Sequence, residues 1–277
     1  AFRNSESTFM RETRASGGVR GSQMRDGGWG GIDVTSLRLA DGAELAPALA
    51  FEAPDDGNAE DRSLARLPLP APVAPGGSIT LDVTFTARLP RVLARTGYAG
   101  DFFFVGQWFP KLAVYEPAGM RGRAAGGWNA HQFHATTEFY ADFGRYDVSI
   151  RLPSRFVVGA TGQRTASTPN GDGTTTHTFV QEDVHDFAWT ADPRYIEQVH
   201  VFSADRDVTP QEYAETAALL GRTLDEVKLR DVEIRLLIQP IHLPQASKYV
   251  ESAKAAIKWY GLWYGRYPYA TLTVVDP

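Results

Sequence analysis

The side chains best suited to chemistry in this sequence are histidines and a carboxylate near its middle. His131 and His134 are followed by Glu138, and imidazole and carboxylate groups are ligands that zinc accepts. If this segment is a strand, residues three apart point to opposite faces, so the two histidines would not easily share one ion. The spacing therefore favours structural histidines over a metal site.

Two further polar stretches have the residue types of a functional site. His185 and Asp186 have the composition of a general base and its orienting carboxylate, but neighbouring strand residues face apart. That geometry favours polar pairing in a loop or at a strand end. The acidic run at 55–61 offers oxygen ligands for calcium, although its spacing differs from that of an EF-hand loop. We expect a solvated loop there.

Complete catalytic motifs are missing from the sequence. None of the six histidines begins an H-E-x-x-H zinc motif, and there is no G-x-S-x-G nucleophile elbow. The sequence therefore predicts no catalytic residue and no metal ligand.

An aromatic run at 102–111 is the least ordinary stretch of the chain. Phe102, Phe103 and Phe104 are consecutive, and three neighbouring side chains cannot all face one side of a sheet. The run therefore predicts a segment buried on both faces, either a core strand or the wall of a ligand cleft.

Composition limits the possible classes of protein. The 277 residues are 43% hydrophobic, which is enough for one large core or one core and a second partial one. The net charge is −5, and Lys and Arg do not cluster among aromatic residues, so no nucleic-acid partner is expected. Because the chain has no cysteine, disulfides and thiolate metal sites are excluded, while the cellular compartment stays open.

Alternating hydrophobic and polar residues predict a β-rich region that extends from residue 32 to residue 187. The clearest strands are 79–89 and 145–152, each of which is followed by a proline. A turn cluster at 169–173 predicts that 156–161 and 174–180 form a long hairpin.

The pattern changes after residue 204. Thr209, Pro210 and Glu212 form a capping box with a proline at the first helical position, and apolar residues at helical spacing extend to Leu224. This stretch predicts a helix.

An α/β pattern follows this helix. A strand at 232–238, a helix at 246–264 and a strand at 271–275 succeed one another. The sequence therefore predicts one domain at 1–204 and the beginning of another at 205–277.

These segments resemble the N-terminal part of bacterial zinc aminopeptidases of the aminopeptidase N family, which are gluzincin metallopeptidases. The resemblance runs through nearly the whole chain. It rests on the aromatic run, Trp128-Asn129, the stretch from Glu138 to Val148, Val184-His185-Asp186-Phe187-Ala188-Trp189, and the stretch from Tyr264 to Pro277. In that family a saddle-like β domain of β-sandwich type precedes a thermolysin-like catalytic domain.

The resemblance implies a mainly β fold, incomplete at its start, followed by the first strand, helix and strand of a truncated catalytic domain. The family's G-x-M-E-N or G-M-E-Y motif and its H-E-x-x-H motif would follow Pro277. Zinc is therefore expected in the parent protein and not in this chain, which should be inert alone. The catalytic domain would lie in the same polypeptide or in a companion chain, and the parent's substrate would be a peptide. A location outside the cytoplasm or at a membrane is favoured.

The resemblance also implies one substrate contact within this chain. In the family, an acidic or amide side chain of the β domain helps to hold the substrate's α-amino group, upstream of the Phe-Pro pair that here is Phe109-Pro110. Asp101 and Gln107 are the two candidates, because an ammonium group needs oxygen acceptors. Extra residues after Pro110 depart from the family's spacing, so both candidates stay open.

A different class of protein is the alternative. A free-standing β-sandwich module would bind its ligand through the aromatic surface around Trp108. Under that alternative the α/β end of the chain should be stable by itself. Under the aminopeptidase interpretation, the helix at 246–264 should leave an apolar face uncovered.

Overall fold

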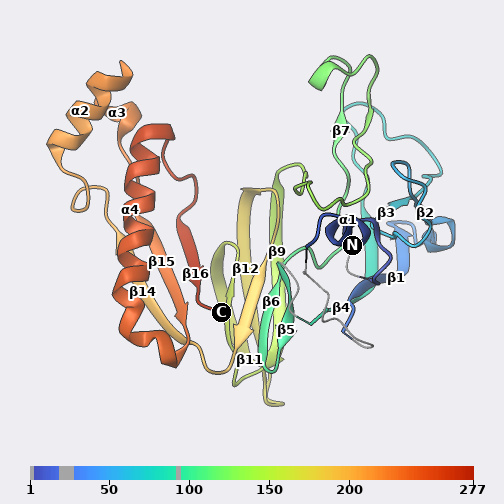
Figure 1. Cartoon of the computed structure of the whole chain (residues 1–277), viewed down its shortest axis with the longest axis horizontal. Coiled ribbons are helices and arrows are strands. Elements are labelled where there is room, and N and C mark those ends of the chain that lie inside the picture. Colours follow the sequence, from blue (N-terminus) through green and yellow to red (C-terminus); the bar gives the residue numbers. More distant parts are fainter. Residues whose placement is uncertain (1–2, 19–27, 92–94) are drawn as a thin grey trace. The chain divides into compact units, whose positions relative to one another are not determined.

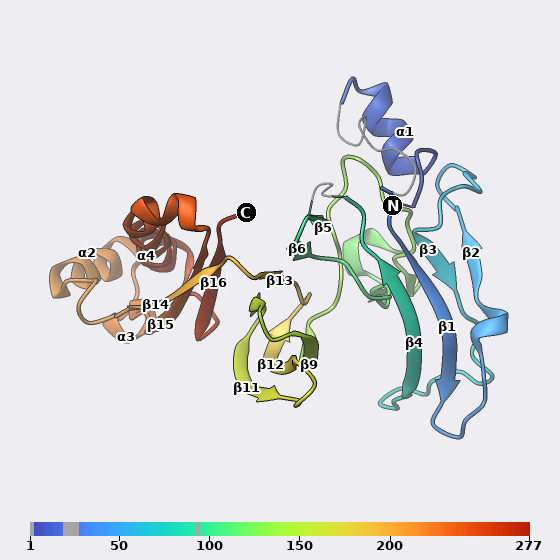
Figure 2. The same cartoon turned by 90° about the horizontal axis from the view of Figure 1, so that it is seen from below.

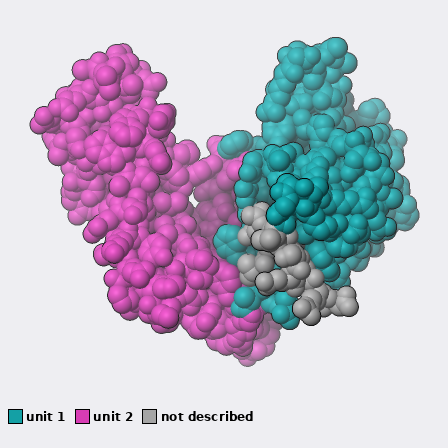
Figure 3. Space-filling view, viewed as in Figure 1, with its two compact units in different colours: residues 1–99, 104–143 teal, residues 100–103, 144–277 magenta. Residues whose placement is uncertain are grey.

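The computed structural model describes residues 3–18, 28–91 and 95–277. The chain forms two compact units, one of residues 1–99 and 104–143 and the other of residues 100–103 and 144–277 (Figure 3). The predicted domain boundary at 204/205 lies inside the second unit and stays a prediction. Strands dominate both units, which confirms the predicted mainly β fold.

The first unit is built on a long antiparallel strand pair. β1 (Gly31–Leu39) and β4 (Leu81–Arg88) pair from Gly31 opposite Arg88 to Leu39 opposite Leu81, with a bulge after Val34 (Figures 1 and 2). β4 falls within the strand predicted at 79–89. Shorter elements of this unit are η1 (Ala46–Ala48), β2 (Ala50–Glu52), β3 (Leu64–Arg66), β5 (Thr96–Ala99), β7 (Tyr115–Glu116), η2 (Met120–Gly122) and β8 (Gly127–Trp128).

Helix α1 (Thr8–Ala15) is held by the acidic loop at 55–61. Asp61 Oδ2 accepts a hydrogen bond from the Thr8 amide at 3.0 Å, and Asn58 Nδ2 donates to the Glu6 carbonyl at 2.8 Å. Asp61 is 1% exposed and Asn58 6%. The loop is exposed at residues 55–57, 59 and 60, as predicted, whereas Asn58 and Asp61 are buried. Asp61 is buried because it accepts from a backbone amide that the start of the helix leaves without a partner.

The second unit contains a three-stranded sheet and strands of a separate four-stranded sheet. The sheet has the order β11 (Gln163–Pro169), β12 (Thr174–Val184), β9 (Gly144–Pro153). β10 (Val157–Ala160) instead pairs with β13 (Trp189–Asp192), which neighbours β6 (Phe102–Val105) in its sheet. The predicted hairpin of 156–161 with 174–180 is therefore wrong in its first strand. Gly162, at φ +85°, turns the chain after β10, so β11 is the strand that reaches the 170–173 turn.

The α/β end of the second unit follows the predicted order. β14 (Ile196–Phe202) pairs antiparallel with β15 (Val232–Ile238), and β15 pairs in parallel with β16 (Thr271–Val275). After η3 (Pro240–Gln245), helix α4 (Ala246–Tyr264) makes the crossover and lies along the sheet (Figure 1). Val250 and Ile257 of α4 join the core formed by β15, which the sequence pattern had indicated.

The helix predicted from Thr209 is shorter than its apolar spacing indicated. α2 (Pro210–Leu220) has the predicted capping box, but Gly221 in a left-handed conformation ends it. Thr223 and Glu226 then form a second capping box for α3 (Leu224–Val227). The apolar period therefore spans two helices. In the part of the chain that the structure describes, no helix is long and apolar enough to cross a membrane.

Candidate functional site

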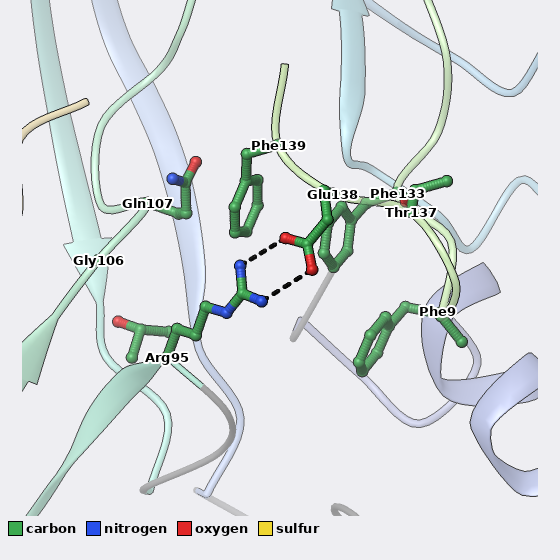
Figure 4. Close-up of a pocket in the computed structure, with 10 residues that line it drawn as sticks. Phe9, Arg95, Gly106, Gln107, Phe133, Thr137, Glu138 and Phe139 are labelled. Atoms are coloured by element: carbon green, nitrogen blue, oxygen red, sulfur yellow. Dashed lines mark hydrogen bonds and ion pairs between the residues drawn. The ribbon is translucent and has the colours of Figure 1, made fainter. Parts of the chain in front are cut away.

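A pocket of about 110 Å³ lies within the first unit (Figure 4). Its walls come from α1, from the start of β5 and the residue before it, and from the segments that follow β6 and β8. One side is aromatic and the other carries an ion pair and an amide. These side chains come from four separated stretches of sequence, so only the fold brings them together.

Three phenylalanine rings form the aromatic side of the pocket. Phe133 stacks on Phe9 of α1 at 5.3 Å between ring centroids and on Phe139 at 4.9 Å. Phe9 is 4% exposed. Stacked rings present a rigid apolar surface, which suits an apolar or aromatic group of a ligand.

The polar side of the pocket is formed by Arg95 and Glu138. The guanidinium donates to both carboxylate oxygens, at 2.6 Å and 2.9 Å (Figure 4). Its hydrogen bonds and charge hold the pKa of the Glu138 carboxyl below its usual value. The two side chains are 61% and 72% exposed, so the pair contributes little to stability and its charges are open to a ligand. Glu138 is thus the ion-pair partner of Arg95.

Gln107 lies at this pocket in an unusual backbone conformation. Its φ is +53°, in the left-handed region that residues other than glycine rarely adopt, at a cost of about 1–3 kcal/mol. Strain of this kind is often kept where it positions a side chain for binding. The Gln107 amide oxygen can accept a hydrogen bond from an ammonium group.

Asp101, the second candidate for a substrate contact, belongs to the second unit. It directly precedes β6, and its carboxylate pairs with Arg155 at 3.2 Å. The Asp101 side chain is 56% exposed. It does not line the pocket of Gln107, so the structure separates the two candidates by their surroundings.

The aromatic run at 102–111 combines both predicted alternatives. Its first part is the core strand β6, in which Phe102 is 8% and Val105 1% exposed. Its next residues, Gly106 and Gln107, line the pocket. Trp108 is half-buried and packs against Phe85 of β4 and against Phe109.

The histidines near the middle of the chain lie closer together than strand geometry predicts. The segment at 129–143 contains no strand, so the opposite-face argument does not apply. His131 Nδ1 and His134 Nε2 each lie 3.0 Å from a different oxygen of Asp55. Within residues 3–18, 28–91 and 95–277, no three His, Cys, Asp or Glu side chains are placed to hold a metal ion.

The other polar pair, His185 and Asp186, follows the end of β12, in agreement with the predicted strand-end position. Asp186 accepts from the Phe187 amide at 2.7 Å, and the His185 carbonyl accepts from the Tyr146 hydroxyl at 3.4 Å. Sequence reasoning missed Phe9 and Arg95, because nothing local marks a residue whose partners lie far along the chain.

Comparisons with known proteins give matches in structure and not in sequence. No protein-family model matches the chain, and no curated protein matches its sequence. The fold is similar to that of Legionella pneumophila aminopeptidase A in complex with aspartic acid, with a TM-score of 0.53 and 13% identity over 88% of this chain. It is also similar to the M1 zinc metallopeptidase from Deinococcus radiodurans, with a TM-score of 0.52 and 15% identity over 88% of this chain.

The chain has the fold of M1 aminopeptidase N-terminal domains. It spans 23% of the length of the Legionella enzyme chain and 46% of the Deinococcus enzyme chain. At these identities the likeness concerns the M1-type fold alone, so activity is a separate question.

Proposed function

We propose that this chain is the non-catalytic N-terminal portion of a zinc-dependent aminopeptidase, of the aminopeptidase N type, which removes N-terminal residues from peptides. The observation that carries the proposal is the similarity over 88% of the chain to two solved peptidase structures. The sequence motifs that resemble the aminopeptidase N family support it independently.

Zinc would be held outside the residues described here. His131 and His134 direct ring nitrogens to carboxylates, and no group of three potential ligands is placed for an ion within residues 3–18, 28–91 and 95–277. These residues do not fit a zinc site. The metal and the general base would come from a catalytic domain in the same polypeptide or in a companion chain.

Helix α4 supports the presence of such a domain. Tyr260, Trp263 and Tyr264 are 62%, 51% and 80% exposed, although large aromatic side chains are usually buried in soluble domains. This is the uncovered apolar face expected if a catalytic domain packs against the α/β end of the chain. The alternative, a binding module with an aromatic surface at Trp108, has less support because Trp108 packs against Phe85.

Gln107 is the better candidate for contact with the substrate's α-amino group. It lines a pocket in a strained backbone conformation, whereas Asp101 does not line that pocket. A hydrogen bond between the Gln107 amide oxygen and an ammonium would contribute about 1.5–3 kcal/mol.

The first test measures zinc content and aminopeptidase activity of the isolated 277-residue chain. We expect neither bound zinc at one ion per chain nor turnover of aminoacyl amides. Stoichiometric zinc together with turnover would contradict the proposal that the zinc site and the catalytic residues lie in another domain.

The second test compares Gln107→Ala with Asp101→Asn in the full-length enzyme. Gln107→Ala should lower kcat/KM by about tenfold or more, because 1.4 kcal/mol corresponds to a factor of ten. Asp101→Asn, the control, should leave kcat/KM nearly unchanged. The reverse pattern would assign the contact to Asp101 instead.

A further inference from the structure

His134 is held between two carboxylates from different parts of the first unit. Its Nδ1 lies 2.7 Å from Glu12 Oε1 on α1, and its Nε2 lies 3.0 Å from Asp55 Oδ2 in the 55–61 loop. A neutral imidazole has only one N–H group and can donate to one of them. Both hydrogen bonds therefore exist together only when His134 carries a proton on each nitrogen.

Each carboxylate has a second partner that fixes its position. The other oxygen of Glu12 accepts from the Ala135 amide at 2.8 Å, and Asp55 Oδ2 also accepts from the Gln132 amide at 2.7 Å. These second hydrogen bonds direct both carboxylates at the His134 ring. After the ring loses a proton, one of them faces a nitrogen lone pair and not a donor, which is repulsive.

The charged groups around His134 favour its protonated form. Glu12 and Asp55 touch the ring, and the charge of His134 also acts on Asp56 in the same loop. On its own segment the neighbouring ionisable group is His131, whose Nδ1 lies 3.0 Å from Asp55. The hydrogen bonds that the ring donates to Glu12 and to Asp55 raise the pKa of His134 above its ordinary value.

Glu12 connects this arrangement to the pocket. It lies one helical turn after Phe9 on α1, and the Phe9 ring is one end of the stack with Phe133 and Phe139. The position of α1 therefore determines the aromatic side of the pocket (Figure 4).

We propose that Glu12, His134 and Asp55 form a proton-dependent clamp that holds α1, and with it the Phe9 side of the pocket, in place. The clamp is intact below the ordinary pKa of histidine and is lost as pH rises through the raised pKa of His134 in the folded protein. In acid it is lost once either carboxylate is protonated. Burial by itself would raise the pKa of Asp55, but hydrogen bonds from His134, the Gln132 backbone amide and His131 outweigh burial and lower it. The clamp does not depend on the aminopeptidase assignment.

The test is amide hydrogen exchange of α1 from about pH 5.5 to about pH 9, corrected for the chemical pH dependence of exchange. Protection of the α1 amides should be steady at the acid end of this range. It should then fall about tenfold as pH rises through the raised pKa of His134. The amides of β1 and β4 in the same unit serve as the internal reference, and their protection should not follow this profile.

Two substitutions separate a proton-dependent clamp from simple packing. His134→Gln cannot ionise, so α1 protection should be lower and independent of pH. His131→Gln is the matched control, because the His131 ring contacts the same Asp55 in the 55–61 loop and is 62% exposed. Its profile should equal that of the wild type.

Glu12→Gln provides a second route if His134→Gln does not fold. This change removes one of the two charges beside His134, so the fall in α1 protection should move to lower pH. A flat wild-type profile, or a profile that Glu12→Gln leaves unmoved, would overturn the proposal. So would a His134→Gln variant that keeps the wild-type fall.

Discussion

Asp276 should be one of the most costly residues to replace in the second unit. The residue is 2% exposed, and its carboxylate accepts hydrogen bonds from the Gln239 backbone amide at 2.9 Å and the Tyr249 hydroxyl at 3.1 Å. His242 Nδ1 donates to it at 2.9 Å. The carboxylate thus connects the ends of β15 and β16 with η3 and α4.

The cost of Asp276→Ala can be worked from these three donors. The Gln239 amide, in a residue 6% exposed, would lose its acceptor in a buried site, at about 1–3 kcal/mol. Tyr249 and His242 are more accessible, and each would lose about 0.5–1.5 kcal/mol as water replaces the carboxylate. We therefore expect the free energy of unfolding to fall by about 3 kcal/mol.

Urea denaturation of the 277-residue chain, followed by circular dichroism, measures this change. Asp205→Ala is the control, because the Asp205 side chain is 79% exposed and pairs with Lys228 at the surface. That substitution should cost less than about 0.5 kcal/mol. A loss below about 1 kcal/mol for Asp276→Ala, or one equal to the control, would refute the reasoning.

The same substitution has a pH signature. Burial would raise the pKa of Asp276, but the hydrogen bonds from Gln239, His242 and Tyr249 outweigh burial and lower it. A carboxyl with a lowered pKa stabilises the fold above its ordinary range, and this stability is lost as pH falls through the lowered value. The difference between wild type and Asp276→Ala should therefore shrink in acid.

Three further substitutions test packing and capping by the same urea measurement. Gly159→Ala should lower the free energy of unfolding by about 1–3 kcal/mol, because an added Cβ would overlap Leu237 Cδ1. Gly144→Ala is its control and should cost less than about 1 kcal/mol, because nothing lies within 4 Å of a Cβ at that position. Equal costs would contradict the packing argument. Thr209→Ala should cost about 1 kcal/mol because it removes the side chain that caps α2, and an unchanged midpoint would show that the cap contributes nothing. Phe187→Ala should cost about 3–5 kcal/mol because the ring is 0% exposed, and a cost near 1 kcal/mol would mean that the site collapses around the missing ring.

Local patterns predicted the regular elements well. The capping box at Thr209 and the apolar stripe of α4 are both present, because each depends on residues within a few turns of helix. The alternation before Pro90 likewise gave β4. Its partner β1 lies about 50 residues earlier in the chain, and no local rule selects it.

The hairpin prediction and, at Asn58 and Asp61, the exposure prediction for the 55–61 loop fail where tertiary contacts override a local sequence rule. The turn at 169–173 agrees with the prediction, but the strand that precedes it is β11 and not β10. The chain turns at Gly162 between these two strands, and β10 pairs with β13 instead. The 55–61 loop is polar in sequence yet partly buried, because its side chains bond to the start of α1. Polarity predicts exposure only when no backbone group nearby needs a partner.

The candidate site also combines residues that the sequence indicated with contacts that only the tertiary structure decides. Residue type singled out the histidines, the family resemblance gave Asp101 and Gln107 as candidates, and hydrophobic period predicted the mainly β character and the α/β end. Only the tertiary structure placed Gln107 beside Phe9 and Arg95, and Glu12 beside His134, because loops and chain crossings set distances between residues far apart in sequence. Period and propensity act over a few residues, whereas a pocket or a histidine held by two carboxylates depends on contacts between distant parts of the chain.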